Sequence, residues 1–158
     1  MRKSLLMVSL AACCALVLSS SVVLAADNWL GTWNVDLAKS KYSPGPTPKS
    51  FTLKFEATPG GIKFTGDGVS ADGKASHSMF LSKFDGKDVP YEGNPDADMA
   101  SPKKIDDNSY ENNWKKGGKA TITSTVVVSA DGKSMTITHT GTNAKGEAVN
   151  NTVVYNKQ

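Results

Sequence analysis

The chain is poor in the residues that most often carry chemistry. Both cysteines, Cys13 and Cys14, lie near the N-terminus, and the only arginine is Arg2. Beyond residue 14 the chain therefore has neither a disulfide nor a cysteine ligand for zinc. These absences exclude a disulfide-stabilised scaffold and a zinc-finger type of site.

An excess of charge of one sign is also lacking. The 158 residues include 18 basic and 15 acidic side chains, a net charge of +3. The lysines stand one or two at a time, often beside turns, as on a solvated surface, whereas a nucleic-acid footprint gathers basic residues on one face. We therefore expect no nucleic-acid partner.

Long apolar runs are absent except for one, from Leu5 to Leu24, which follows two basic residues and ends in Ala25-Ala26. This order predicts a secretory signal peptide at residues 1–26 and one mature domain at residues 27–158, periplasmic or secreted, with no membrane span after processing. Two alternatives stay open. The run is nearly long enough for a transmembrane anchor, and the segment ending at Cys13 resembles a lipoprotein cleavage box, which would anchor the chain through Cys13.

What the chain does have is a recurring turn. Val69-Ser70-Ala71-Asp72-Gly73-Lys74 recurs letter for letter at residues 128–133, and a third Asp-Gly-Lys begins at Asp85. Asp-Gly between alternating runs predicts a tight type I′ hairpin, because glycine and, less readily, aspartate tolerate positive φ. Repeated along the chain, this turn predicts an antiparallel meander.

The segments between the turns read as strands. Phe51, Leu53 and Phe55 alternate with polar residues, the period-2 pattern of a half-buried strand, and no segment has convincing helical periodicity. Ten strands are expected, at residues 29–36, 50–58, 62–69, 75–84, 87–92, 99–105, 109–115, 119–129, 134–142 and 148–156. Pro90 and Pro102 predict weak pairing in the fifth and sixth strands.

This pattern predicts an all-β fold, a single up-and-down antiparallel barrel of about ten strands, because closure removes the unpaired edges of a long meander. A two-sheet sandwich is the main alternative. The proline-rich connector at residues 37–49 is expected to be an extended loop, with one helical turn at Leu37-Ala38-Lys39.

Ten strands are enough to leave a cavity or a flattened, collapsed interior. Alternation along the strands gives the side chains expected to face inward and to contact a ligand, or else simply to form a core. These candidates are Phe51, Leu53, Phe55, Phe64, Met79, Leu81, Tyr110, Trp114, Ile137 and Tyr155, with Ile62, Val126 and Val153 as further inward positions.

Two short motifs frame the predicted domain. Gly31-Thr32-Trp33 resembles the G-x-W signature of lipocalins, and residues 131–137 with 151–157 resemble the final hairpin of intracellular fatty-acid-binding proteins. The chain thus resembles the calycin superfamily, and more closely an exported bacterial lipocalin-like protein. The resemblance implies an up-and-down barrel in which Trp33 packs against the closed end, with Gly31 and Trp33 as structural signature residues.

The chain departs from these relatives at their ligand clamp. The resemblance implies an arginine and a tyrosine that hold a carboxylate, but the predicted domain has no arginine, and lysine offers only a point charge. The two-helix lid of the fatty-acid binders would fall on the proline-rich connector. Fatty-acid binding by the usual clamp is therefore not expected.

Other motifs point to no chemistry. His77 and His139 are far apart in the sequence; if they met across the barrel they would be candidates for haem or zinc, but a solvent-facing or hydrogen-bonded role is favoured. Residues 94–98 place three oxygen side chains at alternate positions, as calcium loops do, but Met99 and Ile105 stand where an EF-hand needs glycine and glutamate.

We expect neither an enzyme nor a resident metal or cofactor. Gly66-Asp67-Gly68 begins a match to a dinucleotide fingerprint, but a hairpin turn follows where a helix is needed. The favoured function is an exported, monomeric carrier for a small apolar ligand. The alternatives are an envelope-structural or protein-interaction barrel with a filled interior and, more remotely, a haem-binding barrel.

Overall fold

The computed structural model describes residues 28–158, in which all regular secondary structure is β. The predicted signal peptide and Cys13 lie outside the described residues. No helix within the described range could cross a membrane. The strands are β1 (Gly31–Lys41), β2 (Ser50–Thr58), β3 (Gly61–Val69), β4 (Ala75–Ser82), β5 (Val89–Pro90), β6 (Met99–Lys104), β7 (Ser109–Lys116), β8 (Lys119–Val128), β9 (Ser134–Thr142) and β10 (Ala148–Lys157).

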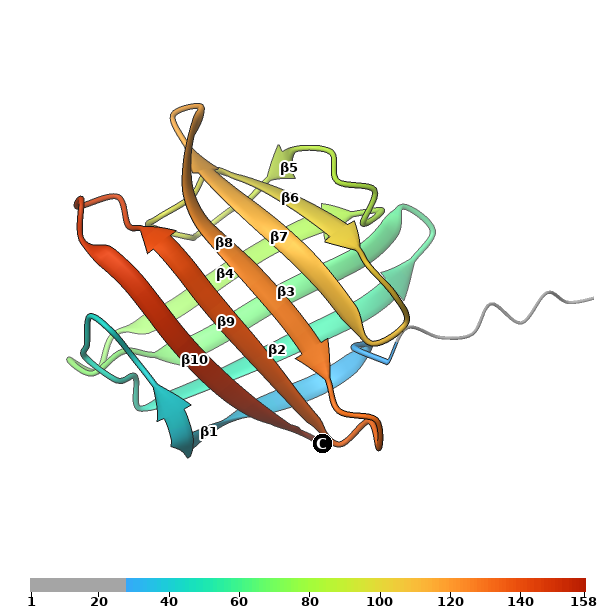
Figure 1. Ribbon diagram of the computed structural model, residues 1–158, viewed down its shortest axis with the longest axis horizontal. Helices are drawn as coiled ribbons and strands as arrows, with labels where there is room; N and C mark the ends of the chain where they lie inside the picture. Colours follow the sequence, from blue (N-terminus) through green and yellow to red (C-terminus); the bar gives the residue numbers. More distant parts are fainter. Residues whose placement is uncertain (1–27) are drawn as a thin grey trace, which may run out of the picture.

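The strands form one antiparallel sheet in the order β4-β3-β2-β1-β10-β9-β8-β7-β6-β5. Except for β4 and β5, which stand at the two ends, neighbours in the chain are neighbours in the sheet, and β1 joins the two halves by pairing with both β2 and β10. The sheet curls until its ends meet through a bridge between Met79 and Glu92. In Figure 1 the wall of β7–β10 lies in front and crosses β1–β4 behind it. The predicted up-and-down barrel is confirmed, and the sandwich alternative is wrong.

Eight strands lie close to their predicted bounds, but β5 is only Val89–Pro90, shorter than the predicted 87–92, and β1 needs a correction. The strand continues to Lys41, so the helical turn expected at Leu37-Ala38-Lys39 is wrong. These residues form an irregularity in the pairing with β10. The Ser40 hydroxyl bridges it by accepting from the Val154 amide (3.0 Å) and donating to the Asp36 carbonyl (2.6 Å). A side chain thus replaces a missing ladder contact and keeps the strand extended.

The repeated Asp-Gly-Lys turn forms two hairpins of the same geometry. In each copy the glycine amide donates back to the serine carbonyl, from Gly73 to Ser70 (2.9 Å) and from Gly132 to Ser129 (2.8 Å). Both glycines have positive φ, but neither preceding aspartate does. The predicted type I′ geometry, which needs positive φ at both residues, is therefore wrong, although the predicted hairpins are present.

One end of the barrel is filled by aromatic side chains. Trp29 and Trp33 are fully buried there, and the Trp33 indole donates to the Trp29 carbonyl (2.8 Å). Trp29 stacks on Phe84 (5.9 Å between ring centroids) and meets the edge of Tyr110 (5.4 Å). Gly31, at φ +119°, starts β1 beside this cluster in a conformation that favours glycine. This cluster closes the barrel at the end where the resemblance places Trp33.

Candidate functional site

The side chains do not fill the other half of the barrel. A cavity of about 490 Å³ lies there, between the aromatic cluster and four connections at the open end. These connections are the β1–β2 loop, the β3–β4 turn, the loop after β5 and the β9–β10 turn. All four tyrosines of the chain, Tyr42, Tyr91, Tyr110 and Tyr155, line the cavity.

The floor of the cavity is apolar, and strand register explains why. At one depth in the barrel, single residues of four neighbouring strands pair directly opposite one another, and the side chain of each points inward. These side chains are Tyr110 on β7, Val126 on β8, Ile137 on β9 and Val153 on β10. Because side chains alternate between faces, the next inward level lies two residues along each strand, toward the open end.

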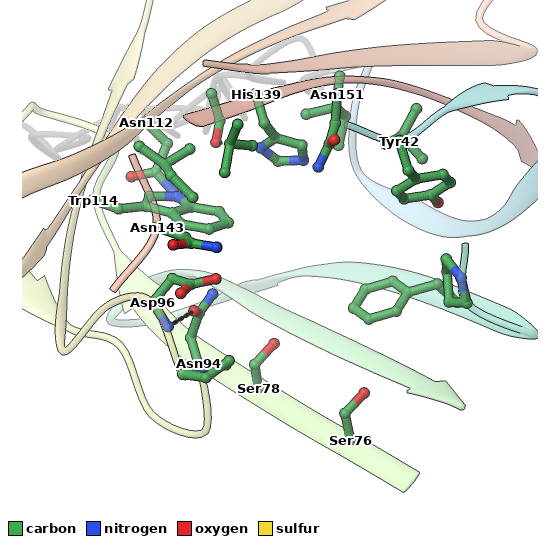
Figure 2. A pocket seen from close by; sticks show the side chains of 18 of the residues that line it. Tyr42, Ser76, Ser78, Asn94, Asp96, Asn112, Trp114, His139, Asn143 and Asn151 are labelled. Carbon is green, nitrogen blue, oxygen red and sulfur yellow. Dashed lines mark hydrogen bonds between the residues drawn. The ribbon is translucent and has the colours of Figure 1, made fainter. Parts of the chain in front are cut away.

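That next level is polar on all four strands. It consists of Asn112, Ser124, His139 and Asn151, which we name the polar belt. Figure 2 shows His139 and Asn151 side by side on this wall, with Ser76 and Ser78 of β4 across the cavity from them. The cavity therefore has an apolar floor and a polar ring above it, an arrangement that can orient a guest.

The belt is electrically neutral at physiological pH. His139 is half-buried against Trp114 (5.3 Å between ring centroids), and its Nδ1 lies 2.8 Å from the Ser124 hydroxyl. Burial lowers the pKa of His139 to about 4, so the imidazole is uncharged at pH 7. His139 is the hydrogen-bonded histidine that the sequence favoured.

Two tyrosine hydroxyls near the floor are available to a guest. Tyr110 and Tyr155 are 3 % and 4 % exposed, and neither hydroxyl has a hydrogen bond within residues 28–158. Burial raises the pKa of both hydroxyls, so both stay protonated. By contrast, the Tyr91 hydroxyl interacts with Asn94 and Ser78, which work against the rise of its pKa.

Within the described cavity lining, acidic side chains and lysine occur only at the open end. The acidic and lysine side chains of this lining are Lys145 and Glu147, in and beside the β9–β10 turn, and Asp96, in the loop after β5. The Asp96 carboxylate accepts from the Ala144 amide (3.0 Å), which fastens the loop to the turn. The Glu147 carboxylate accepts from the Asn143 side chain (2.7 Å).

Seven of the ten predicted contact residues line the cavity: Phe51, Leu53, Phe64, Tyr110, Trp114, Ile137 and Tyr155. Phe55 is buried in the aromatic cluster below the cavity, where its ring meets Phe64 and Tyr110. Whether the lining residues contact a ligand stays a prediction.

The placement of Met79 and Leu81 inside the barrel is wrong. Leu81 is 46 % exposed, while Ser78 and Phe80 line the cavity. Phe80 pairs with Phe64 across the strands and stacks on it (4.6 Å between centroids), which fixes the inner face of β4. The strand has apolar residues on both faces, so alternation alone did not decide between them.

The two histidines do not meet. His77 points outward from β4, where it pairs with Asp67 (2.7 Å), and His139 points inward. The acidic loop at residues 94–98 is likewise divided, because Asp98 accepts from the Gly117 amide (2.8 Å) while Asp96 binds the β9–β10 turn. Among residues 28–158 no group of three metal-binding side chains is assembled.

The polar belt and the inward tyrosines Tyr42 and Tyr91 were not predicted from the sequence. A signal for part of the belt was present, because a hairpin turn fixes which residues lie opposite each other. Val126 and Ile137 were both expected to face inward, so Ser124 and His139, two residues further along each strand, share that face.

Comparison with solved structures finds distant similarities. A zebrafish ileal bile acid-binding protein complexed with cholic acid is similar over 83 % of this chain and 99 % of that chain, with 13 % identity and a TM-score of 0.48. A de novo designed fluorescence-activating β-barrel is similar over 85 % and 97 %, with 14 % identity and a TM-score of 0.44.

No protein-family model matches the sequence. No curated protein matches it either.

Proposed function

We propose that the protein is a carrier that binds one small, largely apolar molecule inside the barrel. The observation that supports this function is the cavity of about 490 Å³ above the aromatic cluster. Small-molecule sites typically occupy about 300–1,000 Å³ and combine apolar walls with a few placed polar groups. The floor and the polar belt have this composition.

The cavity favours a carrier over a barrel with a filled interior. A structural barrel would gain stability by packing side chains across this space, as Trp29, Trp33 and Phe55 do at the closed end. Instead, the Tyr110 and Tyr155 hydroxyls and the belt side chains face open space.

We place the carrier outside the cytoplasm, on the basis of the basic and apolar pattern of residues 1–26. Protein purified from its own host is then expected to begin at Ala26 or Asp27, as N-terminal sequencing would show. If the purified chain still begins at Met1, the proposal of export is wrong, but the proposed carrier function is not affected.

Ligand binding is tested directly on protein from its own host. Native mass spectrometry is expected to show a retained small molecule, and the uncharged dye Nile red is expected to bind saturably with one site per chain. If no mass is retained and the dye does not saturate, the carrier function is wrong.

A matched pair of variants locates the bound dye. Ser76 and His77 are neighbours on β4, with Ser76 lining the cavity and His77 outside it. Ser76→Trp places a large ring in the open end and is expected to weaken Nile red binding at least about ten-fold, because the space is lost. His77→Trp adds the same ring outside and is expected to leave the affinity unchanged. If the two variants change Nile red affinity equally, the dye binds outside the cavity.

A further inference from the structure

The polar belt indicates which chemical groups a bound molecule would need. Asn112, Ser124, His139 and Asn151 lie directly opposite one another across four strands, between the apolar floor and a second apolar level at Ile122 and Val149. Four polar side chains at one depth inside an otherwise apolar wall are costly unless they find partners.

The two amides of the belt are held in one orientation. The Asn112 side-chain oxygen accepts from the Ser101 amide (3.1 Å), and the Asn151 oxygen accepts from the Ser43 amide (2.7 Å). Each backbone donor thereby identifies the amide oxygen, so the NH₂ group is the part left over. Within residues 28–158 neither NH₂ group has an acceptor, although Asn112 is only 4 % exposed.

The imidazole adds a third group at the same level. Its Nδ1 is occupied by the Ser124 hydroxyl, so Nε2 is left for another partner. When the hydroxyl donates to Nδ1, Nε2 carries the hydrogen and is a donor. The belt then offers donors to the cavity from Asn112, His139 and Asn151, and an oxygen acceptor would satisfy them.

The same wall disfavours an ionised guest. The floor and the belt contain no lysine and no carboxylate, and Lys145 is at the open end in the company of Asp96 and Glu147. A carboxylate at belt level would lose its hydration and gain no cation in return. The burial that keeps His139 neutral acts on a charged ligand in the same direction.

We propose that the guest is an uncharged molecule with a carbonyl-type oxygen, which accepts hydrogen bonds from the polar belt while its apolar part fills the floor of the cavity. This inference rests on the proposed carrier function and specifies its ligand class.

The first test varies the ligand. Prodan, an uncharged dye with one carbonyl group, is expected to bind saturably. Its emission is expected to be red-shifted relative to Prodan in an apolar solvent, because its carbonyl is hydrogen-bonded. Decan-2-one is expected to displace it at least about ten-fold more effectively than decanoate at about pH 8, because the two competitors share a chain length and differ in the charge of the head. If decanoate competes as well as the ketone, the inference is wrong and the carrier function stands. If no mass is retained from the host and neither Nile red nor Prodan binds saturably, both are wrong.

The second test varies the belt. Asn151→Asp keeps an oxygen for the Ser43 amide and replaces the NH₂ group with a second acceptor, so Prodan affinity is expected to fall about ten-fold and its emission to shift to the blue. Asn150→Asp makes the same change one residue away on the exposed face of β10 and is expected to change neither. Asn112→Asp, read by near-UV circular dichroism for folding, repeats the test at the more buried position. Unchanged Prodan affinity and emission in Asn151→Asp would overturn the role of the belt.

Discussion

At the scale of the residue, His139 links the cavity to the stability of the whole chain. Burial lowers the pKa of His139 from its ordinary value of 6.5 to about 4. Between those two pH values the unfolded chain binds a proton that the folded chain does not. Stability is therefore complete above about pH 6.5, falls as the pH is lowered toward 4, and is not reduced further by this group below 4.

We predict that this loss amounts to at most about 3 kcal/mol of unfolding free energy. Urea unfolding at about pH 7.5, 5.5 and 4.5 measures it, and the slope is expected to be largely absent in His139→Gln. The surface carboxylates Asp88 and Asp131 have pKa values below 3.8 because of their lysine and serine partners, so their stabilising contributions are lost at still lower pH. A variant with the same slope as the parent protein would assign the effect to other groups.

At the scale of the element, the β2–β3 hairpin shapes one wall of the cavity. Phe51 on β2 lies opposite Gly68 on β3, and its ring covers both Gly66 and Gly68. A Cβ atom on Gly68 would lie 2.3 Å from a Phe51 ring carbon and 3.0 Å from the Ser50 carbonyl oxygen. Glycine on β3 therefore lets the ring lie flat on the sheet and leaves the cavity open.

We predict that Gly68→Ala destabilises the protein by about 1–3 kcal/mol, because the Phe51 ring must leave the sheet. The ring then moves toward the cavity, so Nile red affinity is expected to fall as well. The control is the same substitution in a Phe51→Ala background, where no ring is displaced. A cost of Gly68→Ala that is identical in the two backgrounds would show that the ring is not the cause.

The elements also show which parts of the structure the sequence could predict. Alternation and Asp-Gly turns depend on local backbone chemistry, so eight of the strands and both repeated hairpins are where the pattern puts them. The irregularity of β1 was not predictable in this way, because it depends on a contact between Ser40 and Val154, 114 residues apart. The inner face of β4 likewise depends on the stacking of Phe80 on Phe64 in the neighbouring strand.

The site was harder to predict than the fold for a related reason. Alternation assigns apolar residues to the inside of the barrel, whereas the lining of a binding cavity also includes polar residues. Tyr110, Ile137 and Trp114 were expected inside and line the cavity. Asn112 and Asn151 were not expected there, because on a strand with one face in water a polar residue is usually outside.

At the scale of the whole molecule, the barrel has one weak line of closure. Every other neighbouring pair of strands shares a ladder, but the backbones of β4 and the segment around β5 are hydrogen-bonded only between Met79 and Glu92, at 3.0 and 2.9 Å. Beyond β4 the chain is held to β6 by the Phe84 carbonyl, which accepts from the Lys104 amide (2.9 Å), and by the Gly86 amide, which donates to Pro102 (2.8 Å). Pro90 has no amide hydrogen with which to extend this seam.

We predict that native-state hydrogen exchange is faster at the Met79 and Glu92 amides than at Phe55 and Phe64, which pair in the middle of the β2–β3 ladder. Local opening needs to break few hydrogen bonds at the seam, whereas the ladder opens only with its neighbours. Exchange measured by NMR at near-neutral pH compares the two pairs in one sample.

Gly93 provides the matched perturbation of the seam. It has φ +73°, and a Cβ atom there would lie 2.0 Å from the His77 carbonyl oxygen on β4. Gly93→Ala is therefore expected to accelerate exchange at Met79 and Glu92 and to leave Phe55 and Phe64 nearly unchanged, because the clash acts on the closure and not on the ladder. If the seam amides of the parent protein are as protected as those of the ladder, the barrel closes as firmly there as elsewhere and the seam is not a weak line.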